Sequence, residues 1–520
     1  VSSGGTVDLL KDVISPTESI VVNGTTVILN LNGNTISASG YDGAIYAKNG
    51  AQVTINGDGM IIGNDVNRYA MAVWSNGTGT HVTINGGTYQ NNKAEGNTDE
   101  QMDMIYASDG GTITINGGTL DCITPKWTLN VKDADYKENP DTIQVYGGTF
   151  KNYNPAEAAN ENPVANFVAD GYTVTTEEDG EDTWYTVVPL TAENSAAEVN
   201  GVYYENLTDA IAAADGGTVI LQKDIELSTD IGIELEANVP VTVDLNNFTL
   251  SISKKVYTKE ELEADSSLTN NCIDAENGKS ITFIDGQLDF TCGNVGIYVG
   301  KDSTVTLNNV DYTCNRDPFL VYENAAALNV IGCEVTAGSD AYYCVSTNAA
   351  TPENYGVSIN ITNSTFDGRT CGTAVLFNIP GTLNIDGSTI KGAFHSVIAR
   401  GGDVTIQNST LDNQISTEDW EENKDYFNDK NWMSGNGVTL AALTIGNKSP
   451  NAYQYAVHCT LINTTITVGE GQRTVHISGN ATADLGAYLT YDEASDIGTI
   501  DYGTGYISVN GEVHTDDTVG

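Results

Sequence analysis

Acidic side chains in the second half of the chain are the first residues whose type and spacing could do chemistry. They are Asp285, Asp289, Glu334, Asp340, Asp367, Asp386, Asp403 and Asp412. Hydrolysis of a glycosidic bond needs two carboxyl groups roughly 5–9.5 Å apart. Strands stacked at about 4.8 Å bring carboxylates to such distances by chance in a chain this acidic. A carbohydrate-active enzyme, a polysaccharide hydrolase or lyase, is therefore an alternative hypothesis and not the first one.

Basic and metal-binding residues are too sparse to favour a lyase or a metal centre. A polysaccharide lyase combines calcium ligands with an Arg or Lys base, and Arg400 is the best placed of the scattered arginines. The acidic segments 133–141 and 177–182 lack the full spacing of a calcium-binding loop. His81 and His395 lie at the starts of predicted strands and are expected to be structural or solvated. We expect no catalytic residue set, no cofactor and no metal site, with loose Ca²⁺ binding at most.

Four aromatic residues mark a candidate ligand-binding loop. Trp420, Tyr426, Phe427 and Trp432 lie in a segment of about 412–456 that is otherwise mostly polar. Aromatic rings on a polar loop can stack on sugar rings or dock another protein. The alternative is a lateral loop that folds back, so that its aromatic side chains cover the flank of the fold. The sequence leaves both interpretations open.

Composition and charge exclude several classes of function. The 520 residues include 22 Lys and Arg against 69 Asp and Glu, a formal net charge of −47. Such a chain repels phosphate backbones and anionic lipid, so nucleic-acid and membrane binding are excluded, and a polyuronate-cleaving lyase is disfavoured. The hydrophobic content of 40% is that of a folded protein. No apolar run approaches the roughly 20 residues of a membrane span.

Two homologous modules lie in tandem. The segment 4–13 (GGTVDLLKDV) recurs almost unchanged as 216–225 (GGTVILQKDI), and 44–50 matches 272–278. The second copy has gained a segment around 254–266. It is also preceded by Leu207–Ala214, an amphipathic helix signal that the first copy lacks, so we expect Val1 to lie inside a unit of a larger protein. The predicted modules are 1–190 and 191–520.

A shorter unit recurs inside each module and predicts the fold. Examples are 82–89 (VTINGGTY), 113–120 (ITINGGTL) and 404–411 (VTIQNSTL). Alternation of apolar and polar residues that ends in Gly or Asn predicts a short strand followed by a tight turn. Recurrence at intervals of 21 to 31 residues predicts a solenoid whose coils stack their strands in parallel. We therefore predict an all-β, right-handed parallel β-helix and not an array of β-sandwiches.

The ends of the modules are predicted to carry small caps, because an open solenoid end exposes unpaired strands. Asn154 followed by Pro155 predicts the start of a short helix. The segments 171–176 and 183–188 flank an acidic turn and predict a hairpin. Together these form a helix–hairpin cap at about 150–189. Near the far end, the segments 499–502 and 505–511 predict another strand pair.

The coils resemble those of pectin-lyase-like β-helices. Units of the form x-T-I-x-G-G-T-F, the ending at 166–174 (NFVADGYTV) and the entry at 207–219 (LTDAIAAADGGTV) are similar to modules of gut-bacterial surface proteins and phage virion proteins. The resemblance implies an extracellular location, with other virion or cell-surface proteins, or glycans, as partners. Phage β-helices often form trimers, so it also implies a homo-oligomer. It implies no single activity and does not separate phage from bacterial origin, since this fold hosts many functions.

The cysteines at 122, 272, 292, 314, 333, 344, 371 and 459 contain no Cys-x-x-Cys pair, which disfavours a zinc site. Cys292 and Cys314 each follow the last apolar residue of a repeat unit by two positions. They are expected on adjacent coils, where stacked strands lie within disulfide range. The favoured interpretation is a ladder of small buried thiols, and a Cys292–Cys314 disulfide is the open alternative.

These observations favour a non-enzymatic extracellular protein. It would be a virion fibre or decoration component, or a bacterial surface adhesin, that presents a rigid β-helix for surface or glycan recognition. The alternative is the carbohydrate-active enzyme, with a carboxylate pair in the second module near the 412–456 insertion.

Overall fold

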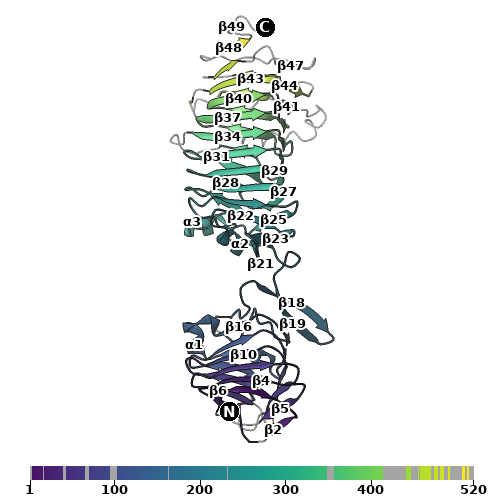
Figure 1. Ribbon diagram of the computed structural model, residues 1–520. Helices are drawn as coiled ribbons and strands as arrows, with labels where there is room; N and C mark the ends of the chain where they lie inside the picture. Colours follow the sequence, from purple (N-terminus) through teal and green to yellow (C-terminus); the bar gives the residue numbers. More distant parts are fainter. Residues whose placement is uncertain are drawn as a thin grey trace. The chain divides into compact units, whose positions relative to one another are not determined.

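A computed structural model describes residues 3–15, 17–38, 42–64, 70–93, 102–161, 163–230, 232–347, 356–413, 441–446, 455, 457–469, 473–477, 481–484, 490–491, 506–509 and 512–514. The chain folds as two compact units, Val1–Thr191 and Ala192–Gly520. Each unit is built from stacked, parallel-paired strands, so the all-β parallel β-helix predicted from the repeats is confirmed (Figure 1).

Unit 1 contains three sheets whose coil strands are parallel, and each coil except the last contributes one strand to each sheet. The first sheet contains β1 (Gly5–Asp8), β4 (Thr26–Asn30), β7 (Gln52–Asn56), β10 (His81–Ile84), β13 (Thr112–Ile115) and β16 (Ile143–Val145). The second contains β2 (Val13–Ser15), β5 (Thr35–Ala38), β8 (Met60–Asn64), β11 (Thr88–Asn92), β14 (Thr119–Asp121) and β17 (Gly148–Lys151). The third contains β3 (Ile20–Asn23), β6 (Ile45–Lys48), β9 (Val73–Asn76), β12 (Ile105–Ser108) and β15 (Leu129–Val131).

The apolar residues of the repeat unit form the core of unit 1. Val53, Val82 and Ile113 pair in register on β7, β10 and β13, and all three are buried. One residue further along each strand, the side chain is partly exposed, as strand geometry requires. Several corners use Asn in the left-handed region, for example Asn32 at a φ of 51°. The repeat therefore determines both which side chains form the buried row and where the chain turns at each corner.

The cap of unit 1 differs in part from the prediction. The hairpin is confirmed as β18 (Tyr172–Asp179) and β19 (Asp182–Pro189), which pairs antiparallel with β17. The helix predicted from Asn154 is wrong. Asn154 makes one turn, in which its Oδ1 accepts from the amide of Ala156 at 3.0 Å, and Ala158 then forms a bridge with Ala165. The chain bends back here to cover the last coil. Short helices η1 (Pro125–Trp127), α1 (Asp133–Glu138) and η2 (Pro140–Thr142) flank β15 and β16.

In unit 2 the first two strands of each coil belong to one continuous sheet. Its first row contains β22 (Thr218–Leu221), β24 (Val241–Asp244), the start of β27 (Ile281–Thr291), the start of β29 (Thr304–Cys314), β31 (Ala327–Ile331), β34 (Val357–Thr362), β37 (Gly381–Asp386), β40 (Gly402–Gln407), β43 (Val457–Ile462), β46 (Ala481–Asp484) and β48 (Tyr506–Val509). Its second row contains β23 (Ile225–Thr229), β25 (Thr249–Lys254), the ends of β27 and β29, β32 (Glu334–Ala337), β35 (Thr365–Gly368), β38 (Thr389–Gly392), β41 (Thr410–Asn413), β44 (Thr465–Val468) and β47 (Thr490–Tyr491).

The remaining strand of each coil forms a separate parallel sheet, here called the third sheet of unit 2. It contains β26 (Ile273–Ala275), β28 (Val295–Val299), β30 (Asp317–Val321), β33 (Tyr343–Ser346), β36 (Thr373–Phe377), β39 (His395–Ala399), β42 (Ala441–Ile445) and β45 (Arg473–Ile477).

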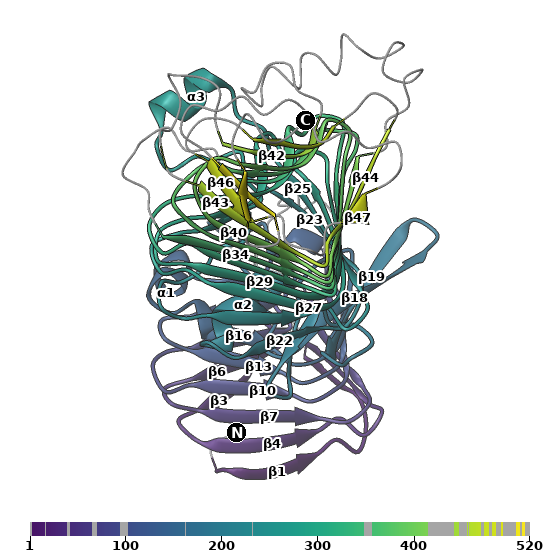
Figure 2. The same ribbon diagram turned by 90° about the horizontal axis from the view of Figure 1, so that it is seen from above.

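Unit 2 begins with the predicted entry. A hairpin of β20 (Ala197–Val199) and β21 (Val202–Tyr204) leads into α2, which spans Leu207–Ala214 as predicted. The inserted segment forms α3 (Lys259–Ala264), which has no buried residue and projects from the coils (Figure 2). Near the C-terminal end, β49 (Glu512–His514) pairs antiparallel with β48, which lies in the second segment of the predicted strand pair; the first segment, 499–502, lies outside the described residues.

All eight cysteines are unbonded and buried. Cys292 and Cys314 lie on adjacent coils with their Sγ atoms 3.9 Å apart, although Phe290 is the residue in register with Cys314. The hydrogen bond with the Cys292 thiol, and then burial, raise the pKa of Cys314, which keeps it a protonated thiol. The buried-thiol ladder therefore describes this structure, in which the disulfide is not formed.

Among the described residues, no helix is long and apolar enough to cross a membrane.

Candidate functional site

Two of the carboxylates considered for catalysis in unit 2, Asp386 and Asp367, are held by local hydrogen bonds. Asp386 accepts from Asn408 at 3.0 Å and from Gln407 at 2.9 Å, and these bonds lower its pKa. Burial raises the pKa of Asp367, but the hydrogen bonds from Arg369 outweigh it and leave the pKa lowered. A general acid at neutral pH needs a raised pKa. These two carboxyl groups are therefore unsuited to donate a proton.

Arg400, the best-placed arginine for a lyase base, is covered, and so is His395, which the sequence predicts to be structural or solvated. Arg400 is 5% exposed and donates to Asn378 Oδ1 at 3.4 Å, and His395 is fully buried beside Thr373. Neither side chain faces open solvent. In the part of the chain that the structure describes, no three His, Cys, Asp or Glu side chains lie close enough together to hold a metal ion. Trp420, Tyr426, Phe427 and Trp432 lie outside the described residues.

The third sheet of unit 1 carries a row of aromatic side chains that we call the aromatic ladder. Tyr46, Trp74 and Tyr106 occupy the same register position on β6, β9 and β12. The ring centroids of Tyr46 and Trp74 are 4.6 Å apart, and those of Trp74 and Tyr106 are 5.9 Å apart. The side chains before and after each ring point into the core, so the rings face outward. Trp74 and Tyr106 remain partly exposed.

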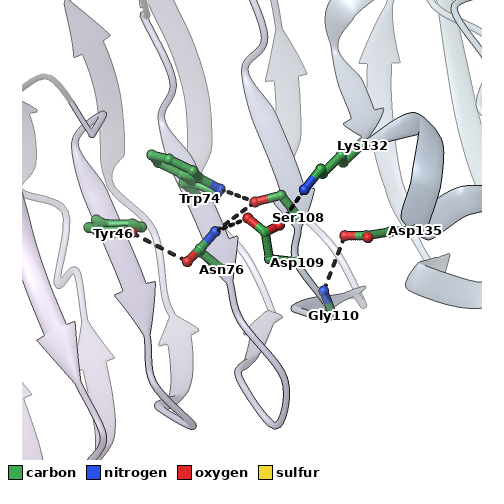
Figure 3. A network of polar contacts seen from close by, with 8 residues as sticks. All are labelled: Tyr46, Trp74, Asn76, Ser108, Asp109, Gly110, Lys132 and Asp135. Carbon is green, nitrogen blue, oxygen red and sulfur yellow. Dashed lines mark hydrogen bonds and ion pairs between the residues drawn. The ribbon is translucent and has the colours of Figure 1, made fainter.

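A hydrogen-bond network holds the ladder in place across the coils (Figure 3). Trp74 donates its indole N–H to Ser108 Oγ at 2.9 Å, and Asn76 donates to the same oxygen at 2.8 Å. The Tyr46 hydroxyl donates to Asn76 Oδ1 at 3.4 Å, and Asn76 also donates to Asp109 at 2.9 Å. Each bond joins neighbouring coils, so the indole plane is fixed before any ligand arrives.

Charged groups border the ladder at the turn after β12. Asp109 and Gly110 both adopt left-handed backbone, with φ of 55° and 83°. Lys132 donates to Asp109 and lowers the pKa of that carboxyl, while Asp135 accepts from the amide of Gly110 at 3.1 Å. On the next strand, Asn130 donates to Asp103 at 2.7 Å.

The pKa values of the tyrosine hydroxyls reflect their burial and the charges around the ladder. The pKa of Tyr106 is raised to about 12 by burial and then by the carboxylates of Asp103, Asp109, Asp135 and Asp133. Burial, followed by Asp42 and Asp109, raises the pKa of Tyr46. The ladder therefore combines aromatic faces, amide and hydroxyl groups, and a negative potential. Such a surface can contact sugar rings and bind their hydroxyls.

Sequence reasoning did not identify this ladder, although a signal was present. The segments 45–50 (IYAKNG), 73–77 (VWSNG) and 105–110 (IYASDG) all place an aromatic residue after the first apolar position of the third strand. Aligning the third strands of successive coils, in addition to the first two, would have shown the repeated ring.

No family model, curated protein or solved structure matches this chain.

Proposed function

We propose that this protein is a non-enzymatic extracellular attachment protein, carried on a virion or a bacterial surface, and that the aromatic ladder of unit 1 binds glycans. The observation that carries the proposal is the placement of Tyr46, Trp74 and Tyr106 in one outward register on three successive coils. Burial in the core does not explain these rings, because Trp74 and Tyr106 remain partly exposed.

The rigidity of the ladder supports binding. Aromatic side chains lose little conformational entropy when they bind, and here Trp74 is already held by Ser108. A sugar ring can contact the part of the indole that stays exposed while its hydroxyls reach Asn76 or Asp109 beside it. Because the rings follow one another from coil to coil, a bound glycan chain would lie across the strands, along the axis of unit 1.

The test is binding of the full chain to a panel of immobilised capsular, mucin and plant glycans. At least one glycan should bind, and Trp74→Ala should weaken that binding about 10- to 100-fold, since a stacking aromatic anchor contributes about 1.4–3 kcal/mol. Mass analysis of the bound glycan should show no cleavage products.

Trp184→Ala is the matched control. Trp184 is also partly exposed on a strand of unit 1, on β19, but it lies outside the ladder. Its substitution should leave glycan binding unchanged. If the two variants lose binding equally, or if no glycan binds the unmodified chain, the ladder is not a glycan site. Shortened glycans among the products would instead support the enzyme hypothesis.

A further inference from the structure

The first coils of the two units are built in the same way. In unit 1 the Asp12 carboxylate accepts from the amide of Thr35 at 2.8 Å, and in unit 2 the Asp224 carboxylate accepts from the amide of Thr249 at 2.8 Å. β1 pairs with β4 as β22 pairs with β24, parallel in both units. The segment that packs on the first coil of unit 2 therefore indicates what fits the first coil of unit 1.

A strand and a helix cover the first coil of unit 2. β20 pairs antiparallel with β22, and the amide of Gln222 donates to Ala196 O at 3.0 Å. The helix α2 then buries one face, including Ala210, in the same hydrophobic cluster as Val219 of β22. Under this cover Val219 is fully buried. We call residues 196–214 the entry element.

Among the described residues, the first coil of unit 1 has no such cover. β1, β2 and β3 are the terminal strands of their sheets. Val7, the counterpart of the buried valine of β22, is partly exposed. Leu10 and Ile14 are 90% and 75% exposed, and unit 2 has Gln222 and Glu226 at the matching positions. A row of free strand edges with large apolar side chains beside it is typical of a surface that another segment covers.

We propose that this open end of unit 1 is a docking surface for a partner polypeptide, and that the partner supplies a segment built like the entry element. Such a segment adds an antiparallel strand to the free edge of β1 and lays the apolar face of a helix over Val7. Strand addition to a free sheet edge is a recurring mode of recognition. Because Leu10 and Ile14 stand where unit 2 has polar residues, the partner also brings apolar side chains to these two positions. The inference does not rest on the glycan site, which lies on the third sheet.

Hydrogen exchange of the full chain tests the docking surface. The probe is a synthetic peptide of residues 194–217, used at about 1 mM. In a second form the same segment is fused to Thr6, so that its two glycines take the places of Gly4 and Gly5. A short connection gives an effective concentration in the mM range, so the two forms are comparable. Each should slow amide exchange in residues 6–10 at least tenfold and leave exchange in unit 2 unchanged.

Matched variants of the added segment provide the control. Ala210→Asp places a charge on the face of the helix that is buried in unit 2, and it should abolish the protection. Ala213→Asp places the same charge at a position that is exposed in unit 2, and it should keep the protection. Both substitutions lie in the added segment, so the two units of the chain itself stay unchanged.

The outcomes are distinct. Protection by both forms, lost with Ala210→Asp and kept with Ala213→Asp, would support the proposal. Absence of protection with both forms would overturn it, and so would equal protection by the two variants. Protection by the fused form alone would show that a separate chain does not dock here. Sedimentation of the unmodified chain checks one more occupant, because a concentration-dependent dimer that the fusion abolishes would assign the surface to a second copy and overturn the proposal.

Discussion

The third sheets of the two units have matching strands but present different side chains outward. In unit 1 the outward register is Tyr46, Trp74 and Tyr106, and two of these rings are partly exposed. In unit 2 the matching register begins with Asp274, Tyr298 and Leu320 and continues through Ser346, Leu376, Ile398 and Thr444.

The later outward residues of unit 2 are buried. Leu376 is 1% exposed and Ile398 is fully buried, and they pack with Tyr343 in a hydrophobic cluster outside the main core. The strands β36, β39 and β42 are accordingly buried on both faces. One backbone pattern therefore supports an accessible polar and aromatic face in one unit and a covered apolar face in the other. Whether the outward face is accessible or covered therefore depends on the outward side chains and not on the backbone of the coil.

The largest expected effect is on stability, at the covered face of unit 2. Ile398→Ala should destabilise the coils around β39 by about 2–5 kcal/mol, because it leaves a cavity in a packed cluster. Hydrogen exchange, read peptide by peptide, would place the loss in unit 2. Ile28→Ala is the control, since Ile28 also points outward but is 39% exposed, and should cost no more than about 0.5 kcal/mol. Equal costs would mean that Ile398 is packed no more tightly than an exposed outward residue.

A smaller effect, on glycan binding, is expected from building a second row of rings in unit 2. Asp274→Tyr together with Leu320→Tyr would place three tyrosines in register with Tyr298 on β26, β28 and β30. Introduced into the Trp74→Ala background, this pair should restore measurable binding of the glycan that unit 1 recognises. A correctly folded variant without binding would show that ring register is insufficient and that the network around Asn76 and Ser108 is also required.

The smallest expected effect is a difference in pH dependence between the units. Glu161 in unit 1 is 4% exposed, and burial raises its pKa, with Asp133 and Asp103 adding to the shift. Its contribution to stability is therefore present below the unfolded pKa of about 4.3 and is lost as the pH rises through the folded value. Glu161→Gln keeps the acceptor for the Val131 amide, which lies 3.0 Å away. The variant should match the parent near pH 4 and be more stable near pH 7.

Asp367 in unit 2 should show the opposite sign. Its pKa is lowered in the fold, so its contribution is present above the unfolded value and is lost as the pH falls. Thermal unfolding of the parent, Glu161→Gln and Asp367→Asn at about pH 4 and pH 7 would measure both. Stabilisation of both variants at pH 7 would contradict this assignment of signs.

The sequence predicted the coil well and its closing segments less well. The repeated units produced the strands, and Leu207–Ala214 formed the predicted helix, because both depend on local alternation and spacing. The helix predicted from Asn154 failed because its side-chain cap supports only one turn. The residues that follow form hydrogen bonds with β15 and not within a helix: Asn160 donates to Leu129 O at 3.0 Å, and Glu161 accepts from the amide of Val131.

By itself the sequence determined that this chain is an acidic, tandem β-solenoid, because alternation, corner residues and charge are local properties repeated many times. Only the tertiary structure decided which outward residues lie next to one another. Tyr46, Trp74 and Tyr106 lie on three successive coils and are far apart along the chain, and stacking of the coils brings their rings together. The same stacking hides Ile398, although its strand position is equally outward. Register between coils is a non-local property, and the candidate site depends on it.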